Sequence, residues 1–145
     1  MTRPERTEWR DLELSRRHRL WGEGCAMTDL DFIANEYDYG RPVGLVEFKR
    51  FGLEASPPNL RHPNMRALAA LADGVNAPFL VAHYQTHPFG FRVFVGNGNN
   101  GNYFVDDGLY TEREFVRGLY YLRGKEPGRS ILESLDNKPL RQRVA

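Results

Sequence analysis

The sequence has one cysteine, no long apolar run and almost no net charge. Cys25 cannot form an intramolecular disulfide and lacks the Cys and His spacing of a zinc site, so neither is expected to support the fold. No uncharged apolar stretch approaches the roughly 18 residues that a membrane span requires. The first ten residues are charged and contain no apolar segment, unlike a secretory signal. We therefore expect a cytoplasmic protein that crosses no membrane.

Positive and negative charges nearly balance, with 20 Lys and Arg residues against 19 Asp and Glu residues. A net charge of +1 creates no overall field that would attract nucleic acid, so only local clusters could bind a phosphate backbone. The length of 145 residues fits a single domain that buries its own core. Composition places this domain in residues 1–127 and a polar C-terminal tail in residues 128–145.

Hydrophobic periodicity and turn residues predict alternating helices and strands. Pro63 is expected to open one helix, and the spacing of Thr111 and Glu114 predicts a capping box at the start of another. The Gly- and Asn-rich run 96–102 predicts a mobile turn, because it lacks the Lys-Ser/Thr ending of a phosphate-binding loop. The order of elements predicts an α/β or α+β domain with a central mixed sheet flanked by helices. The expected helices are 4–21, 63–73, 111–123 and a turn near 131–135, and the expected strands are 28–37, 43–51, 78–84, 91–95 and 103–105.

Acidic residues gather on the first predicted hairpin. Alternate residues of a strand share a face, so Asp29 and Asp31 point the same way, as do Glu47 and Lys49 on the next strand. Pairing of the two strands would bring three carboxylates and one ammonium together. Such carboxylates raise each other's pKa, and a divalent cation is the usual means of keeping them ionised. The pattern predicts a Mg²⁺ or Mn²⁺ site, because Mg²⁺ binds through one or two carboxylates plus water and substrate phosphate.

Each of these residue types has a role in phosphodiester hydrolysis. We expect Asp31 and Glu47 to hold the metal, with Asp29 as the competing ligand. Lys49 would orient or deprotonate the attacking water and stabilise charge on the phosphate. Glu13, from the first helix, would bind a second ion or order the ligands of the first.

These residues resemble the PD-(D/E)XK nuclease superfamily. The resemblance consists of Asp31-Phe-Ile, a turn, and an apolar strand that ends in Val-Glu47-Phe-Lys49, with a helix before them and an Ala/Leu helix and an apolar strand after them. It covers residues 8–85 and is closest to small nuclease-like proteins of phages and prophages. It implies an αβββαβ restriction-endonuclease-like core with later strand and helix additions. The implied activity is a Mg²⁺-dependent endonuclease or junction resolvase that acts on DNA.

The sequence departs from the superfamily's pattern at two points. Leu30 stands where the superfamily's name has proline, and the helical acidic residue is not fixed in position, so Glu8 is an alternative to Glu13. A second acid-x-Lys triplet, Asp136 to Lys138, lies in the polar tail and is not taken as a site.

Basic and aromatic residues supply the expected partner contacts. Arg16 and Arg17 before the hairpin, and Arg50 and Arg61 after it, would follow a DNA backbone. Gln85, just past a strand that flanks the site, would contact substrate or water. A homodimer through Tyr120 and Tyr121 would let two sites cut two strands.

Structural alternatives are open for each feature. Glu47 and Lys49 could form an ion network on a solvated face, Asp29 a turn cap, and Glu13 with Arg17 a partly buried salt bridge. His83 and His87 are expected to be ordinary core or loop residues. The whole chain could be an inactive nuclease-fold protein that binds nucleic acid or a protein, or, more remotely, a transferase built on Asp29-x-Asp31.

Overall fold

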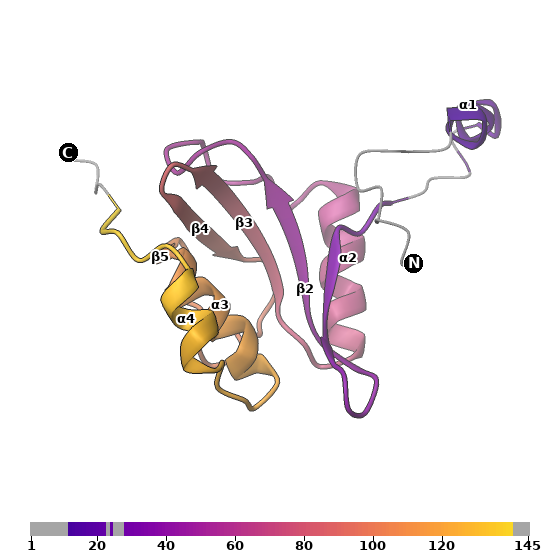
Figure 1. Cartoon of the computed structure of the whole chain (residues 1–145). Helices are drawn as coiled ribbons and strands as arrows, with labels where there is room; N and C mark the ends of the chain where they lie inside the picture. The colour runs from indigo at the N-terminus through magenta and orange to yellow at the C-terminus, as the bar shows by residue number, and fades with distance from the viewer. Residues whose placement is uncertain (1–11, 23, 25–27, 141–145) are drawn as a thin grey trace.

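A computed structural model of the chain describes residues 12–22, 24 and 28–140. It contains helices and strands in the order shown in Figure 1. Among the described residues, no helix is both long enough and apolar enough to cross a membrane. The elements are α1 Leu12–Leu20, β1 Phe32–Glu36, β2 Arg41–Lys49, α2 Pro63–Gly74, β3 Phe79–Thr86, β4 Phe89–Val95, β5 Gly108–Thr111, α3 Glu112–Leu122 and α4 Arg129–Ser134.

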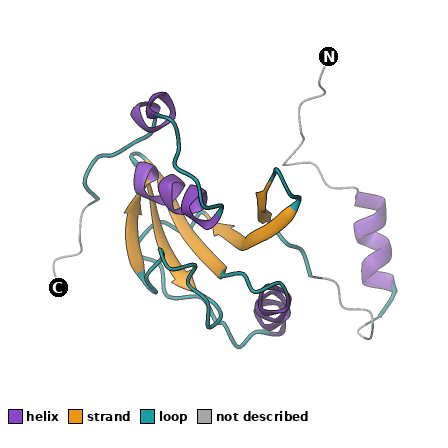
Figure 2. Ribbon diagram, turned by 90° about the horizontal axis from the view of Figure 1, so that it is seen from below, coloured by secondary structure: helices purple, strands orange, loops and turns teal. Residues whose placement is uncertain are grey.

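The strands form one mixed sheet in the order β1-β2-β3-β4-β5. Strands β2 and β3 are parallel and are joined through α2, and every other neighbouring pair is antiparallel. Helices α2 and α3 cover opposite faces of the sheet, as Figure 2 shows. This confirms the predicted α+β domain with a central mixed sheet. Two described strands lie between α1 and α2, where the superfamily resemblance implies three.

Each face of the sheet carries its own apolar core, because β2 and β3 are buried on both sides. Continuous apolar runs are typical of strands in that position. The α2 face buries Leu45, Leu68, Ala72, Phe79, Val81 and Phe94. The α3 face buries Val46, Leu80, Ala82, Phe91, Val93, Phe104 and Phe115. Glu47 and His83 are therefore polar residues set into the α2 face of buried strands.

Most predicted elements are present, with shifted ends. The helix that begins at Pro63 is confirmed, and so is the capping box, in which Thr111 and Glu114 bond to each other's main-chain N–H. The described part of the first helix begins at Leu12, and the first strand begins at Phe32, later than residue 28.

The predicted strand at 103–105 is wrong, and the strand lies instead at Gly108–Thr111. Phe104 is completely buried in the core under α3, and the Tyr103 hydroxyl donates to the Glu114 carbonyl at 2.8 Å. This apolar segment packs against α3 and contacts Tyr110 of β5 without pairing in the sheet, a difference that three residues of periodicity cannot reveal.

The Gly- and Asn-rich run is held by its asparagine side chains, contrary to the expectation of a mobile turn. Asn97 accepts from the Phe79 N–H at 3.0 Å and donates to the Ala77 carbonyl and to Asp73, both at 2.9 Å. Asn99 donates to the Asn76 carbonyl at 3.2 Å. The loop thus fastens the start of β3 to the end of α2.

The described residues after 127 contact the rest of the domain. The Asp136 carboxylate accepts from the Phe89 N–H at 2.9 Å, and the Asp136 N–H donates to Glu112 at 2.8 Å. The Leu140 side chain lies against Gly90, where a Cβ atom would sit only 2.4 Å from it. Asp136, in the second acid-x-Lys triplet, therefore binds the main chain at the start of β4.

Candidate functional site

Asp31 and Glu47 face each other where β1 begins beside the end of β2. The Asp31 N–H donates to Glu47 Oε1, and the Phe48 N–H donates to Asp31 Oδ2, both at 2.9 Å. Each carboxylate is therefore fixed by the main chain of the segment that carries the other. The antiparallel register, in which Phe32 pairs with Val46, produces this reciprocal arrangement. The predicted convergence of Asp31 and Glu47 is present.

Lys49 completes the predicted triad on the same face of β2. The Glu47 side chain is only 5% exposed, and burial raises the pKa of its carboxyl group. The bond from the Asp31 N–H lowers that pKa, the Asp31 charge raises it, and the nearby Lys49 ammonium lowers it. No ion pair within 4.0 Å joins Glu47 to a cation among the described residues. Glu47 is thus a buried acid whose ionised form is incompletely compensated.

The two carboxylates can bind a hard divalent cation. One oxygen of each accepts a main-chain hydrogen bond, and the other has no donor within the described ranges. The same ranges contain no cluster of three or more His, Cys, Asp or Glu side chains suited to a metal. The donor set fits Mg²⁺, which takes one or two carboxylates and completes its octahedron with water and phosphate oxygens. It would suit poorly a metal that needs a full cage of protein ligands.

The remaining acidic candidates occupy other positions. Asp29 is exposed and precedes the first residue of β1, so the alternation of a strand does not extend to it. Glu13 and Arg17 are both exposed on α1, so the alternative of a partly buried salt bridge between them is wrong. Figures 1 and 2 show α1 set apart from the sheet, so Glu13 is not brought to Asp31 and Glu47. Glu8 and Cys25 lie outside the described residues.

The residues predicted to contact substrate also lie in different parts of the structure. Arg50 and Arg61 are exposed and lie on the loop that follows β2, close in sequence to Lys49. Arg16 is exposed on the distant α1. Gln85 is half-buried, shares its face with His83, and donates to the Pro88 carbonyl at 3.2 Å.

Of the two tyrosines expected at a dimer interface, Tyr121 is 48% exposed. Tyr120 is half-buried, and the Arg123 guanidinium lies over its ring at 5.7 Å.

Sequence reasoning missed a pocket of about 420 Å³ beside Lys49. His83 forms part of its wall. The His83 side chain is 1% exposed, and neither ring nitrogen has a hydrogen-bond partner within the described residues. Burial lowers the pKa of His83, and the charges of Arg92 and Lys49 lower it further, so the ring is neutral at physiological pH. Its pairing with Lys49 in the parallel register puts it next to the candidate triad.

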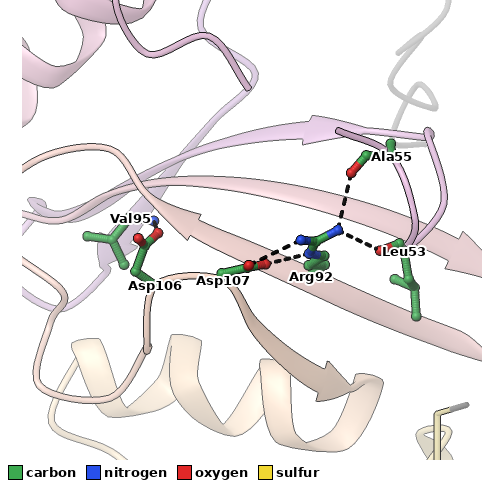
Figure 3. A network of polar contacts seen from close by, with 6 residues as sticks. All are labelled: Leu53, Ala55, Arg92, Val95, Asp106 and Asp107. Atoms are coloured by element: carbon green, nitrogen blue, oxygen red, sulfur yellow. Dashed lines mark hydrogen bonds and ion pairs between the residues drawn. The ribbon is translucent and has the colours of Figure 1, made fainter. Parts of the chain in front are cut away.

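The loop that covers this pocket is held by Arg92, as Figure 3 shows. Arg92 donates to the Leu53 and Ala55 carbonyls at 3.1 and 3.2 Å and forms a two-pronged ion pair with Asp107. Hydrogen bonding to Asp107 raises the pKa of Arg92, which stays charged. The signal in the sequence was an arginine in the otherwise apolar strand Phe89–Val95, which indicates a partner across the fold.

A larger groove of about 900 Å³ lies at the opposite end of the sheet, between the starts of β2 and β3 and the end of α3. Arg41, Arg123, Lys125 and Tyr121 are among its lining residues. The acidic groups next to it, Glu36 and Asp38, are paired with these cations. Size alone favours this groove, but the incompletely compensated carboxylates lie at the other end.

No protein-family model, no curated protein and no solved structure matches this chain.

Proposed function

We propose that this protein is a Mg²⁺-dependent nuclease that hydrolyses DNA phosphodiester bonds. The observation that carries the proposal is the reciprocal main-chain bonding of Asp31 and Glu47, with Lys49 on the same face of β2. The resemblance of the segment from Asp31 to Lys49 to the PD-(D/E)XK superfamily supports the same chemistry. The exposed Arg50 and Arg61 supply positive charge for the DNA backbone near the site.

In this proposal, Asp31 and Glu47 would hold the metal, since the main chain bonds one oxygen of each carboxylate. When bound, Mg²⁺ supplies a Lewis acid for the phosphate and lowers the pKa of a coordinated water. Lys49 is half-buried, so its ammonium group acts in a partly desolvated setting where it stabilises charge that develops on the phosphate. The same group orients the attacking water. Burial of Glu47 favours metal occupancy, because a cation relieves the cost of its ionised form.

Nicking of supercoiled plasmid tests the proposal. With Mg²⁺ or Mn²⁺ the protein should convert supercoiled DNA to open circles, and Lys49→Ala and Glu47→Gln should each lower the rate by about 100-fold or more. Lys125→Ala is the matched control, because it removes a partly exposed lysine from the opposite end of the sheet. Circular dichroism would establish that each variant is folded. Equal rates for Lys49→Ala and the unsubstituted protein would refute the assignment.

A non-catalytic nuclease-fold protein is the second candidate. It is favoured because, within the described residues, no third carboxylate joins Asp31 and Glu47 in a metal-binding group, and because α1, which carries Glu13, is set apart from the sheet in Figure 1. This candidate binds DNA or a protein partner without cutting. Retention of DNA in a mobility-shift assay, with no cleavage in either metal, would support it over the nuclease.

A further inference from the structure

The pocket beside Lys49 has the composition of a site for a flat heterocycle. Phe51, Pro57, Pro58, Met65 and Val81 provide its apolar walls. Its polar groups come from Lys49, Ser56, Asn59, His62, Asn64 and His83. Apolar walls with a few convergent polar groups are typical of sites for small organic groups, and about 420 Å³ accommodates one nucleobase with its sugar.

The two ring nitrogens of His83 lack hydrogen-bond partners among the described residues. A buried donor and a buried acceptor on one neutral ring, with no partner in the described residues, are costly to leave unsatisfied. Its two aromatic neighbours, Phe51 at 5.3 Å and Phe94 at 5.0 Å between ring centroids, offer it no hydrogen bond. A ligand that offers both an acceptor and a donor edge would satisfy it. Nucleobases have such edges.

Phe51 lies against His83 in the pocket wall and provides a surface for stacking. Its ring is 64% exposed and meets the His83 ring edge-on, so few contacts hold it over the histidine. An exposed aromatic ring beside a charged strand end is the kind of platform on which unpaired bases stack. The Arg92 network fixes Leu53 and Ala55, and so the loop that carries Pro57 and Pro58 on the other wall.

We propose that this pocket binds an unstacked base of single-stranded DNA, next to the phosphate held at Asp31 and Glu47. The placement of that phosphate depends on the proposed nuclease function, whereas base binding does not. Lys49 belongs to both the pocket and the candidate triad, so a nucleotide whose base enters the pocket has its phosphate near the carboxylates. A duplex offers no free base to this pocket unless one base is flipped out of the stack. The substrate is therefore a single strand or an unpaired end.

Fluorescence anisotropy in EDTA, which prevents metal-dependent cutting, tests the base-binding step. A labelled single-stranded oligonucleotide should bind more tightly than a hairpin duplex of the same composition. Phe51→Ala should weaken single-strand binding about 5- to 150-fold, the range for loss of one base-stacking platform. Tyr37→Ala is the control, because it removes an aromatic ring that is 81% exposed on the turn at the other end of β1. Equal affinity for single strand and duplex, or no effect of Phe51→Ala, would overturn the proposal.

An oligonucleotide with abasic residues tests the role of His83 without relying on a truncation of the core. His83→Phe keeps an aromatic ring between Phe51 and Phe94 but removes both nitrogens. The unsubstituted protein should prefer normal to abasic DNA, and His83→Phe and Phe51→Ala should each lose most of that preference. An unchanged preference in both variants would exclude the pocket as the base site.

The two proposals fail separately. Base-dependent binding without cleavage in Mg²⁺ or Mn²⁺ would reject the nuclease and leave the pocket. Cleavage that depends on Lys49 but is indifferent to strandedness and to Phe51→Ala would reject the pocket and leave the nuclease.

Discussion

Two glutamates on adjacent strands are equally buried and differently surrounded. Glu36, at the end of β1, is 4% exposed, and Glu47, near the end of β2, is 5% exposed. Glu36 lies 3.5 Å from the Lys125 ammonium and 4.0 Å from the Arg123 guanidinium, and it accepts from the Tyr39 N–H at 2.9 Å. Glu47 instead faces a second carboxylate, that of Asp31.

Under the proposed function, this difference separates a structural acid, Glu36, from a metal-binding one, Glu47. A buried carboxylate with cations beside it belongs to the fold, since it joins β1 to the segment after α3. A buried carboxylate beside another carboxylate costs free energy in the native state and is kept where a bound cation repays that cost. The two ends of the sheet thus bury the same residue type in opposite electrostatic surroundings.

Neutralising Glu36 should have the largest effect on stability. Glu36→Gln keeps the acceptor for the Tyr39 N–H but leaves Arg123 and Lys125 without their buried counter-charge. We expect a loss of about 1–3 kcal/mol in the free energy of unfolding, at the lower end because Lys125 is 41% exposed. Urea denaturation measures it, and Glu47→Gln is the control that should show no such loss. A similar loss in both variants would remove the distinction between the two glutamates.

Metal binding should stabilise the protein through Asp31 and Glu47 and not through Glu36. Mg²⁺ at about ten times its dissociation constant should raise the free energy of unfolding by about 1.4 kcal/mol, seen as a rise in melting temperature. Asp31→Ala should abolish the rise, because it removes one of the two ligands. Glu36→Gln should keep it. A rise that survives Asp31→Ala would place the metal elsewhere.

Without metal, the free energy of unfolding should depend on pH as expected for a carboxyl group whose pKa is raised in the folded protein. Because burial raises the folded-state pKa of Glu47 above the ordinary glutamate value of 4.5, the folded protein takes up this proton at a higher pH than the unfolded chain. This contribution to stability is present at low pH and is lost as pH rises through the folded pKa. Glu47→Gln should therefore raise the melting temperature at neutral pH without metal, by less than the Mg²⁺ effect. No rise, or a fall, would mean that ionised Glu47 is fully compensated.

The smallest effect belongs to Asp38, which is exposed on the turn between β1 and β2 and pairs with Lys125. The hydrogen bond from Lys125, and then its charge, lower the pKa of Asp38. Stability from this pair is present above pH 3.8 and is lost as pH falls through the folded pKa. Asp38→Asn should lower the melting temperature slightly in dilute buffer and not at about 1 M salt, where exposed charges are screened. A loss that persists in high salt would show that more than an exposed ion pair is involved.

The features that depend on residues close together in the sequence could be predicted. The Pro63 helix and the capping box of Thr111 depend on neighbouring residues, and both are present. The pairing of Asp31 with Glu47 was also predictable, because the two residues are 16 positions apart on a hairpin whose alternation could be read.

The pocket and its covering loop could not be predicted from the sequence, because they depend on long-range packing. The pocket needs the parallel pairing of Lys49 with His83, and its covering loop needs Arg92 bonded to Leu53 and Ala55. Arg92 stands out in an apolar strand and indicates that it has a partner, but the sequence does not identify Leu53 and Ala55, and the pairing of Lys49 with His83 leaves no local pattern. The partly buried salt bridge considered for Glu13 and Arg17 was wrong for a related reason, since the sequence of a helix does not identify the element, if any, that packs against it.

The two edge strands, β1 and β5, affect whether copies of the chain can pair through the edges of their sheets. β1 has five residues and a register shift between Ala34 and Asn35, and β5 has four residues, whereas β2 has nine. Short or irregular edges are poor templates for another molecule's strand. The sheet therefore discourages edge-to-edge polymerisation, although Phe32 and Ile33 are exposed on β1.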